Sequence, residues 1–525
     1  MARMQKLAVC LCLAAALSAP AQNHPRDNQI HDIDTKAWWH TTEDLSGDSM
    51  EGRDTGSVAY QRAAEYVAGR FKSAGLKPAG DNNTYFQSVP MHEVAVASEG
   101  TSFVVERPGG NLDLQFLQEI TVAPSEQLAT SGGGPLTFRG YCGKDDLHDA
   151  TQKIVVCFGT QRKGLPSGGE RLASAREAGA LGIINVDDPY FSIEPPRWPY
   201  AYARAVELLQ PGQAAHAGTT PNPMLPGMRI SAAAFTKLLQ GSGQDAAAIL
   251  KTGGAQQPLT SFDIPGTLRV HLHNVTRKLS SPNVIAIQPG SDHNLRNEYV
   301  VVAAHLDGYG LGTPVGGDNL YNGTLDDAAY VALLIQMADD FRAGNIPHPK
   351  RSVLFCAFTG EEKGLLGSNW FVDYPTVPKE SLVADINLDQ LRPLFPLRIL
   401  TALAVNDTTL GLTAREVGKP MGIDIREDRE PERGLLRRAD HYPFLRIGVP
   451  AIGFIFGYDP NTDAEKRYRE WYQVRYHRPQ DDLTQPVDFD AAAKFNQFFY
   501  KLVNAVGDTP NRPVFMKGSP LAPKK

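Results

Sequence analysis

The chain has 525 residues, of which 42% are hydrophobic and 21% are charged, and its formal net charge is −6 at pH 7. This composition is that of a globular protein and excludes global disorder, and the negative charge offers no basic surface to a nucleic acid. Five cysteines in a chain of this length exclude a disulfide scaffold. The length predicts two or three domains, and the profile is typical of a loop-rich enzyme.

The N-terminus has the pattern of a secretory signal peptide. Two basic residues precede an apolar stretch over residues 7–19, and the small residues Ala19 and Ala21 fit cleavage after Ala21. No later stretch reaches the roughly 18 consecutive apolar residues that a membrane span needs. We therefore predict that residues 1–21 are removed and that the protein is secreted or periplasmic, without a membrane span.

Residues 22–124 are predicted to form the N-terminal part of a larger domain. Apolar residues at helical spacing over 62–71 predict a helix that ends at Gly75. From about residue 125 the elements become shorter, with expected strands at 153–158, 182–185 and 228–231 and expected helices at 170–178 and 232–239. We interpret residues 125–262 as a smaller domain inserted into the larger one.

Residues 263–510 are predicted to be the catalytic part of the larger domain, with strands that alternate with helices. The expected strands are 267–273, 283–288, 299–304, 353–358, 383–388 and 449–456, and the expected helices are 327–341, 364–372 and 489–506. We expect the first two strands to form an antiparallel pair. The others predict an open α/β sheet that binds its ligand at the C-terminal ends of its strands. The Pro- and Lys-rich residues 511–525 are predicted to be disordered.

Acidic residues and histidines follow consecutive elements of this expected sheet. They are His305 and Asp307, Asp326 and Asp327, Glu361 and Glu362, and Asp389. Carboxylates gathered in one crevice repel each other unless a cation lies between them. Histidine and carboxylate ligands without cysteine indicate catalytic zinc, with manganese or cobalt as alternatives. A carboxylate shared by two ions predicts a two-metal hydrolytic centre.

Five segments, taken together and in this order, resemble peptidase family M28, the co-catalytic zinc aminopeptidases. They are Ala304–Asp307, Gly323–Ala328, Gly360–Ser368, Ile386–Asp389 and Tyr476–Asp481. The insert at 125–262 resembles the protease-associated (PA) domain that many members carry. The resemblance implies a mixed central β-sheet flanked by helices, of the zinc-exopeptidase (phosphorylase/hydrolase-like) type. It also implies a smaller inserted PA domain of β-rich α/β type.

The resemblance further implies which residues bind metal. His305 and Asp389 would bind one zinc ion, and Glu362 and His477 would bind the other. Asp326 would bridge the two ions.

The resemblance also implies a catalytic role for two more residues. Glu361 would be the general base, which takes a proton from the metal-bridging water and passes it to the leaving amine. Asp307 would hydrogen-bond the far nitrogen of His305 and so fix its tautomer. The resemblance also implies a cis peptide bond between Asp326 and Asp327.

These residues predict a secreted dizinc aminopeptidase that hydrolyses N-terminal residues from peptides. One alternative is a carboxypeptidase or dipeptidase of the same fold, in which Arg437 or Arg438 would bind the substrate carboxylate. A one-zinc glutaminyl cyclase and a non-catalytic PA-domain binding protein are further alternatives, and the complete ligand set argues against both. The sequence leaves open the preferred N-terminal residue, the oligomeric state and whether Cys142 and Cys157 form a disulfide.

Overall fold

A computed structural model describes residues 24–159, 164–191, 194, 196–211, 224–389 and 391–523. The predicted signal peptide at 1–21 lies outside these residues. Within the described ranges, every helix is too short or too polar to cross a membrane.

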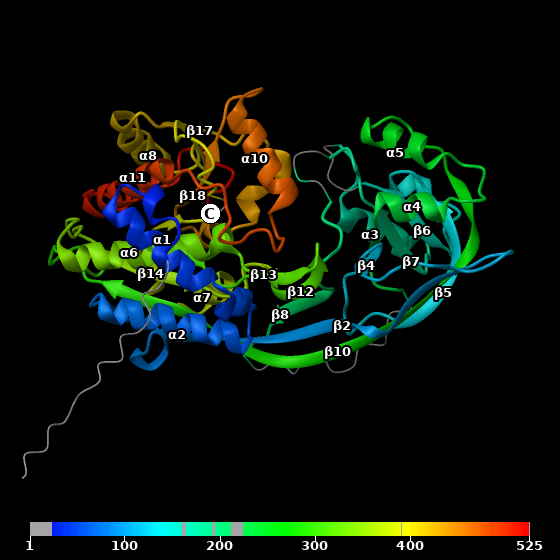
Figure 1. Cartoon of the computed structure of the whole chain (residues 1–525), viewed down its shortest axis with the longest axis horizontal. Coiled ribbons are helices and arrows are strands. Elements are labelled where there is room, and N and C mark those ends of the chain that lie inside the picture. The colour runs from blue at the N-terminus through cyan, green and yellow to red at the C-terminus, as the bar shows by residue number, and fades with distance from the viewer. Residues whose placement is uncertain are drawn as a thin grey trace, which may run out of the picture.

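An open mixed β-sheet forms the centre of the larger unit (Figure 1). Its strands, in spatial order, are β17 (Asp424–Arg426), β16 (Ile399–Leu403), β18 (Ala451–Gly457), β15 (Leu382–Asn387), β11 (Tyr299–His305), β14 (Ser352–Phe358) and the end of β10 (Phe262–Gln288). Strands β18, β15, β11 and β14 are parallel to one another, whereas β16 and β10 run antiparallel to their neighbours β18 and β14. The predicted fold class, a mixed α/β sheet flanked by helices, is therefore confirmed.

Helices cover both faces of this sheet because its central strands are apolar on both sides. In β11, Val300 and Val302 pack on one face and Val301 and Ala303 on the other, as the two-residue period of a strand requires. The first face is covered by α1 (Ile33–Ser46), α2 (Val58–Ser73), α6 (Ala329–Ala343), α8 (Leu410–Gly418), α10 (Asp463–Val474) and α11 (Phe489–Asp508). The second face is covered by α7 (Leu366–Asp373) and α9 (His441–Arg446).

The helix predicted over 62–71 is α2, and its ends follow local signals. The side chain of Ser57 accepts a hydrogen bond from the backbone N–H of Tyr60 and caps the first turn. The helix stops before Gly75, which has a φ of 84° that favours glycine.

Two long antiparallel strands, β2 (Phe86–Glu106) and β10, run from the larger unit into a smaller one (Figure 1). The predicted antiparallel pairing of 267–273 with 283–288 is wrong, because both segments lie on the single strand β10. The polar residues between them do not turn, because their backbone groups pair with β2. The short strands β1 (Lys77–Pro78) and β3 (Leu112–Asp113) add to β10 and β2.

The smaller unit has its own hydrophobic core. Its strands are β4 (Ile120–Val122), β5 (Ser131–Phe138), β6 (Ile154–Phe158), β7 (Gly182–Val186) and β9 (Met228–Ile230), and its helices are α3 (Gly168–Glu177), α4 (Ala232–Leu238) and α5 (Ala246–Gly254). The core takes in residues from Val96 to Leu272, so the predicted boundaries at 125 and 262 fall inside it. Strands β2 and β10 extend from one core to the other, so the boundaries at 125 and 262 stay a prediction.

A middle segment of the smaller unit returns to the larger one. Strand β8 (Arg204–Leu208) pairs with residues 91–95 of β2. Beside it lies the hairpin of β12 (Gly310–Val315) and β13 (Asp318–Tyr321), between the two units (Figure 1). The backbone N–H of Thr313 donates a hydrogen bond to the carbonyl of Ala201. The two units are therefore in contact through this segment and the hairpin, as well as through the paired strands β2 and β10.

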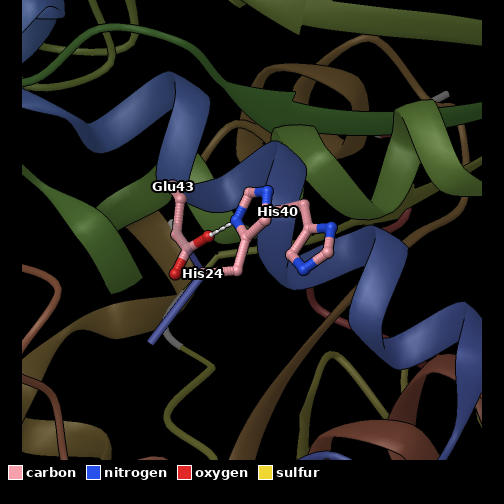
Figure 2. Close-up of side chains that lie close together, drawn as sticks. All are labelled: His24, His40 and Glu43. Atoms are coloured by element: carbon pink, nitrogen blue, oxygen red, sulfur yellow. Dashed lines mark hydrogen bonds and ion pairs between the residues drawn. The ribbon is translucent and has the colours of Figure 1, made fainter. Parts of the chain in front are cut away.

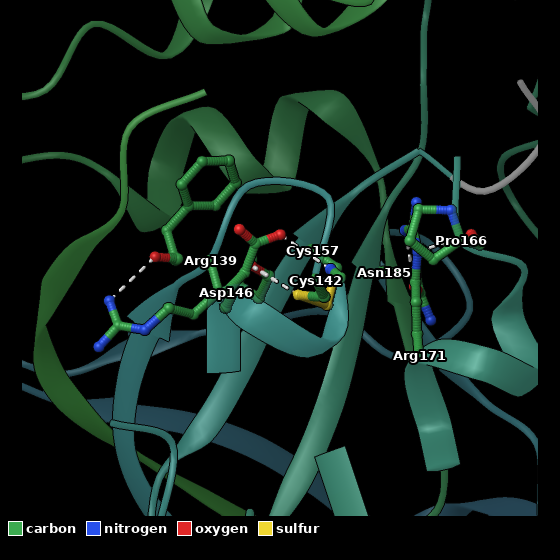
Figure 3. Close-up of a disulfide and its surroundings, with 10 residues drawn as sticks. Arg139, Cys142, Asp146, Cys157, Pro166, Arg171 and Asn185 are labelled. Atoms are coloured by element: carbon green, nitrogen blue, oxygen red, sulfur yellow. Dashed lines mark hydrogen bonds between the residues drawn. A yellow bond between two sulfur atoms is a disulfide. The ribbon is translucent and has the colours of Figure 1, made fainter. Parts of the chain in front are cut away.

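A disulfide joins Cys142 to Cys157 on β6 (Figure 3). The two Cα atoms are 5.5 Å apart, within the usual range for this bond. Both side chains are buried in a small apolar cluster with Leu147 and Ala175. The structure thus resolves a pairing that the sequence left open.

The predicted disorder of residues 511–525 is wrong for the described part of that segment. Phe515 forms a β-bridge with Thr408, and the backbone N–H of Met516 donates to the carbonyl of Asp407. Phe515 and Leu521 also pack against the core on the second face of the sheet. These two apolar side chains anchor a segment whose proline and lysine content is typical of disorder.

Candidate metal centre

The candidate site lies at the C-terminal ends of the parallel strands in the larger unit. His305 is the last residue of β11, Glu361 and Glu362 follow β14, and Asp389 follows β15. The three strands pair in parallel with matching register, so these residues reach the same edge of the sheet. Asp326 lies in the π-helical turn Thr324–Ala328, immediately before α6.

Asp326 lies between the two predicted histidine ligands. Its Oδ1 atom is 3.3 Å from Nε2 of His305, and its Oδ2 atom is 3.3 Å from Nε2 of His477. Nε2 of His477 is also 3.2 Å from Oε2 of Glu362. The five predicted ligands fall into two groups that share Asp326: His305, Asp326 and Asp389, and Asp326, Glu362 and His477.

The distances and the donor atoms fit a metal ion. Zinc–ligand distances of about 2.0–2.1 Å at tetrahedral angles place neighbouring ligand atoms about 3.3 Å apart. Nε2 of His305, Oδ2 of Asp326 and Oε1 of Glu362 are buried without a hydrogen-bond partner among the described residues. Such atoms cost roughly 1–3 kcal/mol each unless something binds them. Imidazole and carboxylate donors without thiolate are those of a catalytic zinc site.

A second group of histidines and a carboxylate, His24, His40 and Glu43, lies near the N-terminus (Figure 2). The rings of His24 and His40 stack with their centroids 3.5 Å apart. Nδ1 of His24 is 2.5 Å from Oε2 of Glu43, and Nε2 of His40 is 2.6 Å from Oδ1 of Asp27. These are hydrogen-bond distances, so one nitrogen of each ring already has a carboxylate partner. The group is a pair of hydrogen bonds that hold the N-terminal segment against α1.

A buried arginine that the sequence did not single out stabilises the charge of Asp326. Burial by itself would raise the pKa of Asp326, but Arg392, His305 and His477 hold that pKa well below its ordinary value. Nη2 of Arg392 is 3.4 Å from Oδ1 of Asp326. The guanidinium group is fully buried, and it also lies over the ring of Trp471. The only sequence signal for it is its position three residues after Asp389.

Glu361 lies next to the ligands and has a perturbed pKa. Burial raises the pKa of Glu361 well above its ordinary value, and the carboxylates of Asp389 and Glu362 add to this effect while His305 opposes it. One carboxylate oxygen lies within 4.8 Å of ligand atoms of His305 and Glu362. A carboxylate that readily accepts and releases a proton at this position suits general acid–base chemistry.

Asp307 supports the site through different atoms from those expected. Nδ1 of His305 is 3.0 Å from the backbone carbonyl oxygen of Asp307, whereas the carboxylate is 3.8 Å away. That carboxylate instead accepts hydrogen bonds from the hydroxyl of Thr55 and from the backbone N–H of Glu361. The main chain of Asp307 therefore orients His305, and its side chain fixes the backbone at Glu361.

Asp327 adjoins the centre without belonging to either ligand group. Its Oδ2 atom accepts a hydrogen bond from the backbone N–H of His305. The peptide bond between Asp326 and Asp327 is cis, as the resemblance implied.

The two arginines expected to bind a substrate carboxylate in the carboxypeptidase alternative are engaged elsewhere. Arg438 donates to both carboxylate oxygens of Glu194, at 2.8 and 2.9 Å. Arg437 lies over the ring of Tyr442.

Comparison with known proteins gives a family match over the segment that carries the site and partial matches to several curated proteins. Residues 283–503 match the sequence profile of peptidase family M28. A probable zinc metalloprotease of Pyrenophora tritici-repentis is 27% identical over 267 residues, which cover 43% of this chain and 58% of that protein. Transferrin receptor protein 2 of Rattus norvegicus is 26% identical over 283 residues, which cover 49% of this chain and 33% of that protein. The chain spans about half the length of the curated relatives that it matches.

The solved structure of an aminopeptidase from Aneurinibacillus sp. strain AM-1 has the same fold. Its TM-score is 0.59 at 18% sequence identity, and the match covers 94% of this chain and 96% of that chain. The profile match and the shared fold both include the strands that carry His305, Glu362 and Asp389. Residues 283–503 therefore match peptidase family M28, and the chain has the fold of a solved aminopeptidase.

Proposed function

We propose that this protein is an exported dizinc aminopeptidase that removes residues from the N-termini of peptides. The observation that carries the proposal is the pair of ligand groups joined at Asp326, with Glu361 beside them. Relatives described as a zinc metalloprotease and an aminopeptidase support the choice of metal and of reaction. The Cys142–Cys157 disulfide supports export, because such bonds are rare in the reducing cytosol.

In this proposal each ion has its own histidine and its own carboxylate. His305 and Asp389 would hold the first ion, and Glu362 and His477 would hold the second. Asp326, whose two oxygens each lie 3.3 Å from one of the histidines, would serve both ions. When bound, the two ions would polarise the scissile carbonyl group and make the attacking water more acidic.

Glu361 moves the proton in this reaction. Its carboxylate takes a proton from the attacking water and then delivers that proton to the nitrogen of the leaving amine. The hydrogen bond from its backbone N–H to Asp307 fixes the residue beside the ligands. Arg392 keeps Asp326 ionised, so that both of its oxygens can act as ligands.

The similarity to transferrin receptor protein 2 supports a second candidate, a binding protein without catalysis. The two candidates differ in what Glu361 is for. A binding protein needs no base beside its ligand groups, whereas a hydrolase does. The complete ligand set and the placement of Glu361 therefore favour the hydrolase.

Zinc content and hydrolysis, measured together, test the proposal. We expect the purified protein to bind about two zinc ions and to cleave aminoacyl 4-nitroanilides but not their N-acetylated forms. Glu361→Gln should keep both ions and lower kcat by about 10²- to 10⁴-fold. The matched variant Glu362→Gln should lose zinc as well as activity.

Two results would contradict the proposal. Two bound zinc ions without hydrolysis of any peptide would favour the binding protein. Activity confined to substrates with a blocked N-terminus and a free C-terminus would favour the carboxypeptidase.

A further inference from the structure

Tyrosine side chains cover the outer side of His477. The hydroxyl oxygen of Tyr309 is 2.8 Å from Nδ1 of His477, and the two ring centroids are 4.5 Å apart. Tyr309 in turn stacks on Tyr202 and Tyr321, with centroid distances of 5.6 and 6.0 Å and interplanar angles of 25° and 27°. We call Tyr202, Tyr309 and Tyr321 the tyrosine stack.

The hydrogen bond of Tyr309 determines how His477 can act. Nε2 of His477 faces Asp326 and Glu362, at 3.3 and 3.2 Å. A histidine that offers Nε2 to a metal carries its proton on Nδ1, and that N–H needs an acceptor that fixes the plane of the ring. The hydroxyl oxygen of Tyr309 is that acceptor. This hydroxyl oxygen faces Nδ1 of His477 in the same way as the backbone carbonyl oxygen of Asp307 faces Nδ1 of His305.

Tyr202 comes from the smaller unit, in the segment that leads into β8. Its hydroxyl accepts a hydrogen bond from Nζ of Lys363 at 2.7 Å, and Lys363 directly follows Glu362. The guanidinium group of Arg204 lies 3.7 Å from the centroid of the Tyr202 ring and forms an ion pair with Asp54. These contacts hold Tyr202 in place against Tyr309.

We propose that Tyr309 is a positioning residue for His477 and that Tyr202, supplied by the smaller unit, holds Tyr309 in position. The proposal rests on the proposed function only in taking His477 as a metal ligand. It assigns to the smaller unit a role in the affinity of the second ion. Because Tyr202 and His477 are far apart in the chain, only the folded protein brings them together.

The test is a zinc titration of Tyr309→Phe in competition with a chelator. This variant keeps the aromatic stack and removes the hydroxyl that accepts from His477. We expect the affinity for the second zinc ion to fall by about 10- to 100-fold, with the first ion unchanged. The matched control is Tyr321→Phe, which removes a hydroxyl of the same stack that donates to the carbonyl of Thr313 instead of contacting His477. The control should keep wild-type affinity for both ions.

A second pair of variants tests the part assigned to the smaller unit. Tyr202→Ala should lower the affinity for the second zinc ion in the same way. Tyr202→Phe, which restores the ring, should recover most of the lost affinity. The visible absorption spectrum of the cobalt-loaded protein should change in Tyr309→Phe and in Tyr202→Ala but not in the control Tyr321→Phe. A general loss of stability would not produce this pattern. Wild-type affinity for both ions in folded Tyr309→Phe would overturn the proposal, as would equal losses in Tyr309→Phe and Tyr321→Phe.

The titration separates this proposal from the proposed function. A wild-type protein that binds two zinc ions but hydrolyses no peptide would contradict the aminopeptidase, and the titration would still decide the role of Tyr309. A wild-type protein that binds no second ion would overturn the role of Tyr309 directly.

Discussion

Asp326 is the residue on which the two ligand groups depend. It is the only member common to both groups among the described residues, and it presents one oxygen to each histidine. An amide at this position would offer one weak oxygen donor and a nitrogen that cannot bind a cation. The buried charge of Arg392, 3.4 Å from Oδ1, favours the ionised carboxylate that a shared ligand must be.

We expect Asp326→Asn to bind at most one zinc ion per chain, because only one of its side-chain atoms remains a ligand. Metal content measured by mass spectrometry checks this. Asp327→Asn is the matched control, since its side-chain oxygen can still accept from the backbone N–H of His305. The control should keep two ions. Two ions in Asp326→Asn would show that this residue is not shared.

At the scale of single elements, the turn after β14 places both glutamates at the site. Gly360 has a φ of 66°, and a Cβ atom there would lie 3.0 Å from Cβ of Leu366. A glycine is therefore required for the chain to turn from the end of β14 and bring Glu361 and Glu362 back toward His305. Motif residues and turn residues thus belong to one short segment, which explains why the sequence alone pointed to them.

The disulfide acts on another element, the loop that leads into β6. Cys142 and Cys157 are 15 residues apart, so the bond removes roughly 3 kcal/mol of loop-closure entropy from the unfolded chain. We expect the double variant Cys142→Ser and Cys157→Ser to lower the unfolding temperature of the smaller unit, as followed by calorimetry. Zinc binding should be unchanged in this double variant. As a control, Cys356→Ala, which removes a buried free thiol, should not change the unfolding temperature of the smaller unit. A shift confined to the larger unit would contradict this prediction.

At the scale of the whole molecule, buried ion pairs join the two units beside the site. Glu194 of the smaller unit is bound by Arg438 of the larger one, and Arg433 lies 4.0 Å away. Burial alone would raise the pKa of Glu194, but the hydrogen-bonded Arg438 and the neighbouring arginines hold that pKa at about 2. The contact between the units therefore contains a carboxylate that is ionised at neutral pH.

The sign of the pH dependence follows from this low pKa. Because the pKa of Glu194 is lower in the folded protein than in the unfolded chain, its stabilising effect is present above the usual glutamate pKa of about 4.3. The effect should be lost as the pH falls from there toward about 2. We expect the hydrogen exchange of residues at the contact to speed up over that range in the wild type. Glu194→Gln should show fast exchange already at neutral pH, and an unchanged wild-type profile would contradict the assignment.

The sequence by itself determined the fold class and predicted most of the residues that the structure brings together at the candidate site. Four of the predicted site residues lie at or just after the end of an apolar strand: His305, Glu361, Glu362 and Asp389. Parallel strands bring their C-terminal ends to the same edge of a sheet, so these residues are placed together by the strand pattern itself. His477 follows a helix and has no such signal, so it was predicted only through the resemblance to the family. The domain boundaries stay a prediction, because the strands β2 and β10 contribute residues to both cores.

Only the tertiary structure showed which side chains pack around the candidate ligands. Arg392, Tyr309 and Tyr202 act through side-chain contacts with residues distant in the chain, and no local pattern marks such contacts. The atom of Asp307 that orients His305 was likewise decided by the fold, because Thr55 and the backbone of Glu361 take up its carboxylate. Ligand positions follow from strand periodicity, which is local, whereas their orientation depends on packing between distant segments, which is not.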